Sequence, residues 1–268
     1  MCETCGCDDP AAAPRLTSFS ADGEAAGCSG RELLLEQRVL AKNDEQAEQT
    51  RQWLAARSVL AVNLMSSPGS GKTTLLERTV RDLAGRWPLA VVEGDQESVR
   101  DAERIRAGGV PVVQVNTGRG CHLDADMVDR ALRVLDPPAD GVVFVENVGN
   151  LVCPALFDLG EGVRVVLTSV TEGEDKPLKY PHMFAQADLV LLTKCDLVPF
   201  LAVDVDRCIG LIRRINPAAD VFTLAGLHLP AGVPGTEPEP GLAAWYAWLD
   251  ARRRRPDARP RAAVAGRV

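Results

Sequence analysis

The chain has 268 residues, enough for one large α/β domain or two small domains, and its composition, 46% hydrophobic and 25% charged, is typical of a globular protein. Its formal charge of −7 argues against a general nucleic-acid binder, because such proteins usually carry a basic surplus. The sequence contains no apolar run long enough to cross a membrane, and its N-terminus lacks the pattern of a secretory signal. We therefore expect a cytoplasmic protein without nucleic-acid or membrane partners, whose eight cysteines are thiols free to bind metal.

Composition divides the chain into four parts. Residues 1–30 are rich in Ala, Gly, Asp, Ser and Pro and predict a flexible tail. Residues 31–57 contain neither Pro nor Gly and predict a leading helical segment, with a break near Asn43. Residues 58–250 predict the main domain, and 251–268, which contain four consecutive arginines, predict a disordered tail.

Within the main domain, short Val-rich runs alternate with helix-compatible segments. The runs are almost continuously hydrophobic, as is typical of strands buried on both faces. The predicted strands are Val59–Leu64, Leu89–Val92, Val112–Val115, Val142–Val145, Val163–Ser169, Leu189–Thr193 and Val221–Leu224. The predicted helices are 72–84, 98–107, 124–135, 178–187, 200–215 and one around Leu242–Leu249. This alternation predicts an α/β fold: a mostly parallel twisted sheet with helices on both faces.

A phosphate-binding loop follows the first predicted strand. Residues 66–74 match the Walker A pattern G-x-x-x-x-G-K-[ST], except that Ser66 stands at the first glycine position. Two glycines allow the backbone to curl around phosphate oxygens at a helix N-terminus. Lys72 is expected to neutralise the β- and γ-phosphates, and the Thr73 hydroxyl to ligate Mg²⁺. The predicted phosphate site consists of Gly69, Ser70, Gly71, Lys72, Thr73 and Thr74.

A second motif, Thr193-Lys194-Cys195-Asp196, follows a late strand and resembles the Asn-Lys-x-Asp guanine-specificity motif of GTPases. The Asp196 carboxylate can accept hydrogen bonds from guanine N1–H and the 2-amino group, which adenine does not offer. The aliphatic stem of Lys194 can cover the base, and Thr193 replaces the usual Asn. Because strand ends carry the ligand sites of such sheets, the motif favours GTP. Residues 225–227 replace the usual Ser-Ala-Lys loop, so only backbone contacts are expected there.

Two more predicted strands end in acids, at Asp95 and Glu146. An acid beside a phosphate loop can hold Mg²⁺ directly or through water. Gly149, three residues after Glu146, resembles the glycine of the Asp-x-x-Gly switch, whose amide senses the γ-phosphate. Asp95 is the other candidate for magnesium or for positioning the attacking water. The candidate catalytic residues are therefore Lys72, Asp95 and Glu146, with the two acids' roles left open.

Two groups of residues have the spacing or placement of metal ligands. The first, Cys2, Cys5 and Cys7, can wrap one ion with the α-amino group as a fourth ligand, which suits square-planar Ni²⁺ or tetrahedral Zn²⁺. The second, Cys121, His122 and Cys153, lies just past two strand ends and should meet near the nucleotide. Water or a second subunit would complete its coordination. The alternatives are a redox-sensitive tail and, for Cys153, a buried core residue.

Together these motifs resemble the HypB family of hydrogenase nickel-incorporation GTPases, which belong to the SIMIBI class of P-loop GTPases. The resemblance covers roughly residues 58–250 and the N-terminal cysteine motif. Its carriers are the phosphate loop from Pro68 to Thr74, Asn116–Gly118 with Cys121–Asp124, Glu146–Pro154 and Thr171–Pro181.

The resemblance implies metal-binding roles and partners that the spacing of the residues alone does not. It implies that Cys2, Cys5 and Cys7, with the Met1 amine, form a high-affinity nickel site. It also implies that Cys121, His122 and Cys153 form a weaker nickel or zinc site. It further implies a homodimer on GTP binding, a nickel chaperone partner, HypA, and indirect action on the hydrogenase large-subunit precursor.

The expected function is accordingly a Mg²⁺-dependent GTPase that delivers nickel during [NiFe]-hydrogenase maturation, with GTP-dependent dimerisation coupled to metal transfer. One alternative is a P-loop kinase with Asp95 as base, against which the Thr193–Asp196 motif argues. Another is a zinc-binding scaffold whose nucleotide site is only structural. Selective hydrolysis of GTP would distinguish the GTPase hypothesis from the kinase and scaffold hypotheses.

Overall fold

The computed structural model describes residues 30–96, 100–227 and 239–254, with side chains from residue 38 onward. The predicted tail with Cys2, Cys5 and Cys7 and most of the predicted C-terminal tail lie outside the described residues. Within the described part, no helix is both long and apolar enough to cross a membrane.

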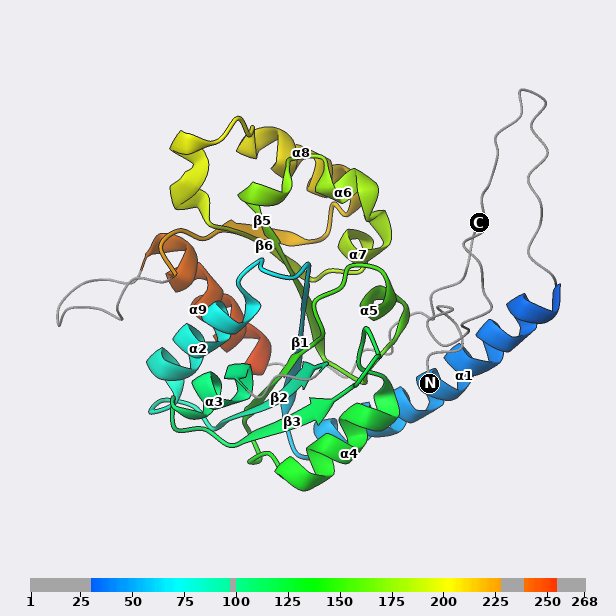
Figure 1. The fold of residues 1–268 in the computed structure, drawn as a ribbon. Helices are drawn as coiled ribbons and strands as arrows, with labels where there is room; N and C mark the ends of the chain where they lie inside the picture. The colour runs from blue at the N-terminus through cyan, green and yellow to red at the C-terminus, as the bar shows by residue number, and fades with distance from the viewer. Residues whose placement is uncertain (1–29, 97–99, 228–238, 255–268) are drawn as a thin grey trace.

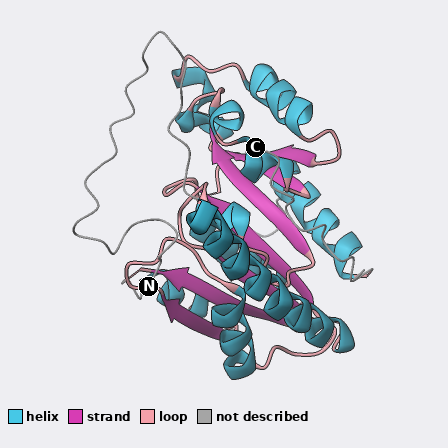
Figure 2. Cartoon of the chain, turned by 90° about the vertical axis from the view of Figure 1, so that its right-hand side faces the viewer, coloured by secondary structure: helices cyan, strands magenta, loops and turns pink. Residues whose placement is uncertain are grey.

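Seven described strands form one sheet in which every paired strand is parallel (Figures 1 and 2). They are β1 (Leu60–Ser66), β2 (Leu89–Asp95), β3 (Val112–Asn116), β4 (Val142–Glu146), β5 (Val163–Ser169), β6 (Leu189–Thr193) and β7 (Asp220–Thr223). Their order is β3-β2-β4-β1-β5-β6-β7. The predicted fold class, a P-loop NTPase with a parallel sheet, is confirmed. Because β1 lies inside the sheet, the loop that follows it opens at the carboxyl edge, where such sheets bind ligands.

Helices cover both faces of the sheet (Figure 1). They are α1 (Gly30–Ala56), α2 (Lys72–Leu83), α3 (Arg100–Arg106), α4 (Ala125–Leu135), α5 (Cys153–Leu156), α6 (Lys176–Lys179), α7 (Pro181–Ala185), α8 (Val205–Ile215) and α9 (Pro240–Arg253). Two 3-10 turns, η1 (Val170–Glu172) and η2 (Cys195–Phe200), follow β5 and β6. α2 and α9 pack on one face, where Trp245 Nε1 donates to Thr79 Oγ1 at 2.9 Å. α1 and α4 pack together on the other face.

The predicted helix 178–187 is wrong as a single element. It is two short helices, because Pro181 has no N–H to continue the ladder and its ring disfavours a helical residue before it. The predicted helix 200–215 also starts later: the 3-10 turn ends at Phe200, and Asp204 caps α8 by accepting from the Arg207 amide.

The predicted break near Asn43 is wrong, because α1 is continuous. Asn43 is buried, and its side chain bonds two other elements instead of interrupting its own helix. Its Oδ1 accepts from the Ala125 amide at 2.9 Å, and its Nδ2 donates to the Asp158 carbonyl at 2.8 Å. Arg51, two turns along α1, pairs with the Asp158 carboxylate at 2.6 Å. α1 is thereby tied to the start of α4 and to the loop before β5.

Candidate nucleotide and metal sites

The phosphate loop has the backbone shape that its glycines predict. Gly69 and Gly71 have φ angles of 75° and 97°, in the region that residues with a Cβ rarely adopt. Lys72 is the first residue of α2, and its buried Nζ donates to Ser66 Oγ at 3.0 Å. Burial lowers the pKa of Lys72, although nearby carboxylates, Glu146 foremost, oppose this shift. The loop can thus present one cation and its amides to an incoming phosphate.

The departure from the Walker A pattern at Ser66 has a structural explanation. Ser66 is the last residue of β1 and does not have a positive φ, so no glycine is needed there. Its hydroxyl holds the Lys72 ammonium at the loop. The serine therefore keeps the shape of the loop and adds a contact that glycine lacks.

Glu146, rather than Asp95, directly contacts the predicted magnesium-binding threonine. Thr73 Oγ1 lies 2.7 Å from Glu146 Oε1 and 3.1 Å from Asp101 Oδ2. Glu146 is 4% exposed, and its Oε2 has no hydrogen-bond partner. A hydroxyl beside an unpartnered buried carboxylate oxygen is a donor set that suits Mg²⁺. Asp95 lies at the half-buried end of β2.

The sequence interpretation missed two acids of this cluster, Glu93 and Asp101. Glu93 lies directly beside Glu146 in the β2–β4 register and is 2% exposed, and its Oε2 has no hydrogen-bond partner. Burial and the adjacent Glu146 raise the pKa of Glu93 to about 8. The two-residue spacing between Glu93 and Asp95 was a usable signal, because alternate residues of a strand share a face. No spacing pattern in the sequence pointed to Asp101, which lies on α3.

We expect Glu93→Gln to stabilise the metal-free protein at alkaline pH. The folded-state pKa of Glu93 is above its ordinary value, so folding stability is lost as pH rises from about 4.5 through about 8. Gln carries no charge and avoids this loss. A tenfold change in proton affinity corresponds to about 1.4 kcal/mol, so we expect a gain of about 1 kcal/mol or more at pH 9. Urea unfolding at pH 5 and pH 9 measures it.

Glu103→Gln, on the exposed surface of α3, is the control and should change stability little at either pH. An equal effect of Glu93→Gln at both pH values would contradict the assigned environment.

The Thr193–Asp196 motif contacts the phosphate loop. Thr193 Oγ1 donates to the Ser70 carbonyl at 2.7 Å, so threonine bonds this loop from the position of the usual asparagine. Lys194 has a φ of 60°, an uncommon conformation for a residue with a side chain. Asp196 Oδ1 accepts from the Gly226 amide at 2.9 Å. The loop after β7 therefore lies beside the predicted base-binding carboxylate and offers backbone groups there.

A further residue missed from the sequence, Glu172, supports the phosphate loop. Its Oε1 accepts from Ser70 Oγ at 2.6 Å and from the Ser169 amide at 2.9 Å. Lys176 Nζ lies 3.0 Å from its other carboxylate oxygen. Glu172 lies in one of the segments that carry the family resemblance, and that was its only signal in the sequence.

Cys121, His122 and Cys153 come together, as the sequence interpretation expected. One ligand atom from each lies within 4.8 Å of the others, and Cys121 Sγ is 3.7 Å from His122 Nδ1. Cys153 begins α5, and the other two precede α4. Burial lowers the pKa of His122, although Asp124 opposes the shift, and this favours the neutral imidazole that binds metal.

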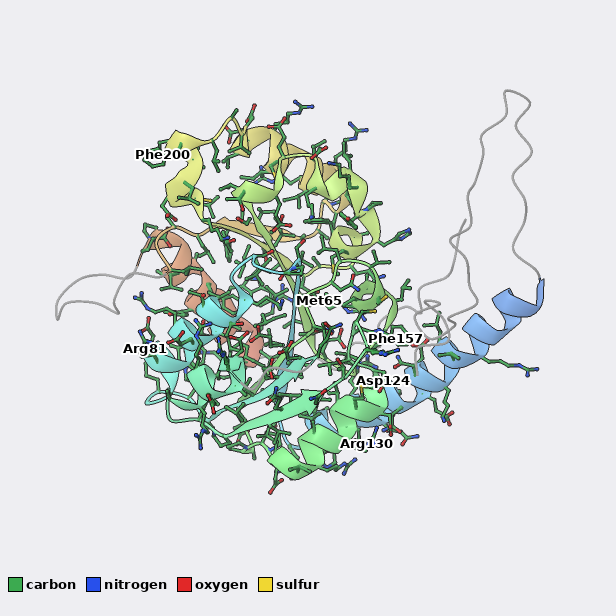
Figure 3. The ribbon with its side chains drawn as sticks, in the orientation of Figure 1. Met65, Arg81, Asp124, Arg130, Phe157 and Phe200 are labelled. Atoms are coloured by element: carbon green, nitrogen blue, oxygen red, sulfur yellow. The ribbon has the colours of Figure 1, made fainter. Side chains whose placement is uncertain are left out.

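Phe157 packs on one side of the candidate metal cluster, Cys121, His122 and Cys153. The ring centroids of Phe157 and His122 are 4.1 Å apart, and Figure 3 shows Phe157 near Asp124, which caps α4 by accepting from Met127. Two thiols and an imidazole form a borderline-soft donor set that suits zinc or nickel, and they leave at least one coordination position for another ligand. Cys208, by contrast, is buried in the core.

The predicted switch residue Gly149 lies against the phosphate loop. A Cβ at this position would lie 3.1 Å from Pro68 Cα, so the two backbones are in direct contact. Four residues later the chain reaches Cys153. The loop between β4 and α5 therefore extends from the phosphate loop to the candidate metal cluster.

Comparison with known proteins identifies the family. Residues 60–223 match the nucleotide-binding domain family described as CobW/HypB/UreG. The hydrogenase maturation factor HypB of Azotobacter vinelandii is 53% identical over 234 residues, which cover 87% of this chain and 74% of that protein. The chain belongs to the HypB family. The resemblance inferred from the motifs is thus confirmed.

Solved HypB structures share its fold. HypB from Helicobacter pylori in complex with nickel is 36% identical, with a TM-score of 0.71, covering 80% of this chain and 95% of that one. HypB from Archaeoglobus fulgidus is 37% identical, with a TM-score of 0.70, covering 80% of this chain and 100% of that one.

Proposed function

We propose that this chain is a Mg²⁺-dependent GTPase that delivers nickel during [NiFe]-hydrogenase maturation. The observation that carries the proposal is that Cys121, His122 and Cys153 lie together, with the segment Glu146–Gly149 bonded to the residue after His122 and ending four residues before Cys153. The names of the relatives, hydrogenase maturation factors, and the nickel complex of the Helicobacter pylori protein support it.

GTP hydrolysis requires charge neutralisation and positioning rather than covalent chemistry by the protein. Lys72 and the loop amides would neutralise the phosphates, and Thr73 and Glu146 would hold Mg²⁺, which supplies Lewis-acid charge neutralisation when bound. Asp95, at the neighbouring strand end, would position the attacking water or a magnesium-bound water. Hydrolysis would return the protein from its GTP-bound to its GDP-bound conformation.

Nickel is the cargo in this proposal. Cys2, Cys5 and Cys7, with the Met1 amine, would form the tighter site, and Cys121, His122 and Cys153 the weaker one, which can also take zinc. A homodimer formed on GTP binding would bring a second subunit to the site of Cys121, His122 and Cys153, the inner site. HypA would take nickel onward in the cytoplasm, and the hydrogenase large-subunit precursor would receive it indirectly.

Guanine selectivity tests the nucleotide part of the proposal. Asp196→Asn is expected to weaken GTP binding about 10- to 100-fold, because a hydrogen bond to a charged group contributes about 1.5–3 kcal/mol. ATP binding should stay as weak as in the wild type. Competition against a fluorescent GDP measures both nucleotides. The matched control is Asp204→Asn, which alters a helix cap remote from the base and should leave GTP affinity unchanged.

Equal affinities of the wild-type protein for GTP and ATP would contradict the GTPase assignment and favour the P-loop kinase hypothesis. Tight binding without any hydrolysis would favour the metal-binding scaffold.

A further inference from the structure

Asn147 links the nucleotide switch to the metal cluster through one side chain. It directly follows Glu146 and is 1% exposed. Its Oδ1 accepts from the Leu123 amide at 3.0 Å and from its neighbour Val148 at 3.0 Å. Leu123 directly follows His122. The buried side chain of Asn147, next to Glu146, is therefore bonded to the backbone of Leu123, next to His122.

Leu123 also contacts the strand that carries the other acids. A Cβ on Gly94 would lie 2.8 Å from carbons of the fully buried Leu123 side chain, so this side chain packs directly on β2 between Glu93 and Asp95. The Thr117 amide donates to the Asp95 carbonyl at 2.9 Å. The segment from Thr117 to Leu123 is thus attached to both acid-bearing strand ends.

On the nucleotide side, the switch segment is attached to the phosphate loop at both ends. Glu146 contacts Thr73 at 2.7 Å, and Gly149 lies against Pro68. A phosphate or magnesium ion that displaces both contacts would shift the backbone between them, which includes Asn147. Because packed, hydrogen-bonded segments move as units, the Leu123 amide and the adjacent His122 would shift as well.

We propose that Asn147 is the positioning residue that transmits the nucleotide state to Cys121, His122 and Cys153. The inference rests on the proposed function, since it requires that nucleotide and metal binding are coupled. A side chain with an acceptor oxygen is required because the two amides that it binds are buried. Alanine at this position leaves them without that acceptor.

The chain contains a matched control in Asn43. Its Oδ1 accepts from the Ala125 amide at 2.9 Å, two residues beyond Leu123, in the same kind of buried contact. It connects this segment to α1 and, through Asp158, to the loop that carries Phe157, but not to the switch. Loss of either asparagine should lower the metal affinity of Cys121, His122 and Cys153. Only loss of Asn147 should make that affinity independent of the bound nucleotide.

The test is nickel titration of the full-length chain carrying Cys2→Ala, Cys5→Ala and Cys7→Ala, with GDP or a non-hydrolysable GTP analogue bound. In this background we expect nickel affinities in the two states to differ by about fivefold or more. Adding Asn147→Ala should bring the ratio close to one. Adding Asn43→Ala should preserve the ratio, even where the absolute affinity falls.

A background ratio of one would overturn the proposed coupling and this inference together. A ratio that survives Asn147→Ala, or is lost equally with Asn43→Ala, would overturn only the role of Asn147.

Hydrogen exchange provides a test that needs no asparagine variant, so it also decides the case where Asn147→Ala does not fold. In the same chain with Asn147 intact, the exchange rate of the Leu123 amide should differ between the GDP and GTP-analogue states by about fivefold or more, while that of Ala125 stays constant. An unchanged Leu123 amide in protein whose nickel affinity does respond to nucleotide would overturn the inference.

Discussion

Lys72→Ala is expected to reduce GTP hydrolysis by about 100- to 1,000-fold, the range for loss of one preorganised group that stabilises charge in a transition state. Lys72 is the buried cation at the N-terminus of α2, beside the turn formed by Gly69 and Gly71. Its removal leaves the loop amides in place, so nucleotide should still bind, although more weakly. Single-turnover hydrolysis, with the enzyme in excess over GTP, measures the chemical step separately from product release.

Lys179→Ala is the control for this experiment. Lys179 pairs with Asp175 on the surface of α6, where loss of an exposed ion pair has little effect. It should hydrolyse GTP within about twofold of the wild-type rate. If Lys72→Ala also retained the wild-type rate while folded, the catalytic role of the lysine would be wrong.

Cys153→Ala should weaken nickel and zinc binding at the inner site by about 10- to 100-fold or more. Loss of a residue that only hydrogen-bonds a metal ligand already weakens metal affinity by about this factor, and Cys153 would be a direct ligand. Cys153 would supply one of three ligands, and His122 and Cys121 alone would make a poor site for either ion. Competition with a chromophoric chelator, in full-length protein lacking the cysteines at positions 2, 5 and 7, measures the affinity.

The control is Cys208→Ala, which removes a cysteine from the core and not from the cluster. Burial raises the pKa of the Cys208 thiol to about 11, so it remains protonated at neutral pH and is a poor metal ligand. This variant should bind both metals as the parent protein does. Unchanged affinity in Cys153→Ala would show that the three residues do not form the site.

The sequence predicted most of the sheet because buried parallel strands have a simple signature. Val163–Ser169 and Leu189–Thr193 are mostly apolar runs, and their strands have the predicted bounds. The phosphate loop was equally recognisable, since a glycine turn followed by Lys-Thr at a helix start has few other uses. Helix boundaries were harder where proline or a capping aspartate, rather than periodicity, determined them, as at Pro181 and Asp204.

The supporting residues of the site had little signal in the sequence beyond the two-residue spacing between Glu93 and Asp95. Glu93 and Glu172 are acids like any others in the sequence, and only the packing of β2 and η1 buries them beside functional groups. Asn43 looked like a helix breaker because asparagine favours turns, yet tertiary contacts hold it within a continuous helix. Asn147 likewise depends on a contact between segments 24 residues apart.

In the proposed function, GTP controls metal binding at the inner site. The most direct measurement titrates nickel into the apo-protein, as the full-length chain, with GDP or a non-hydrolysable GTP analogue, and records affinity, stoichiometry and molecular mass. Our account predicts an inner-site affinity that differs about fivefold or more between the two states, with a dimer only in the GTP-analogue state. Identical inner-site affinity and identical mass in both states would contradict it.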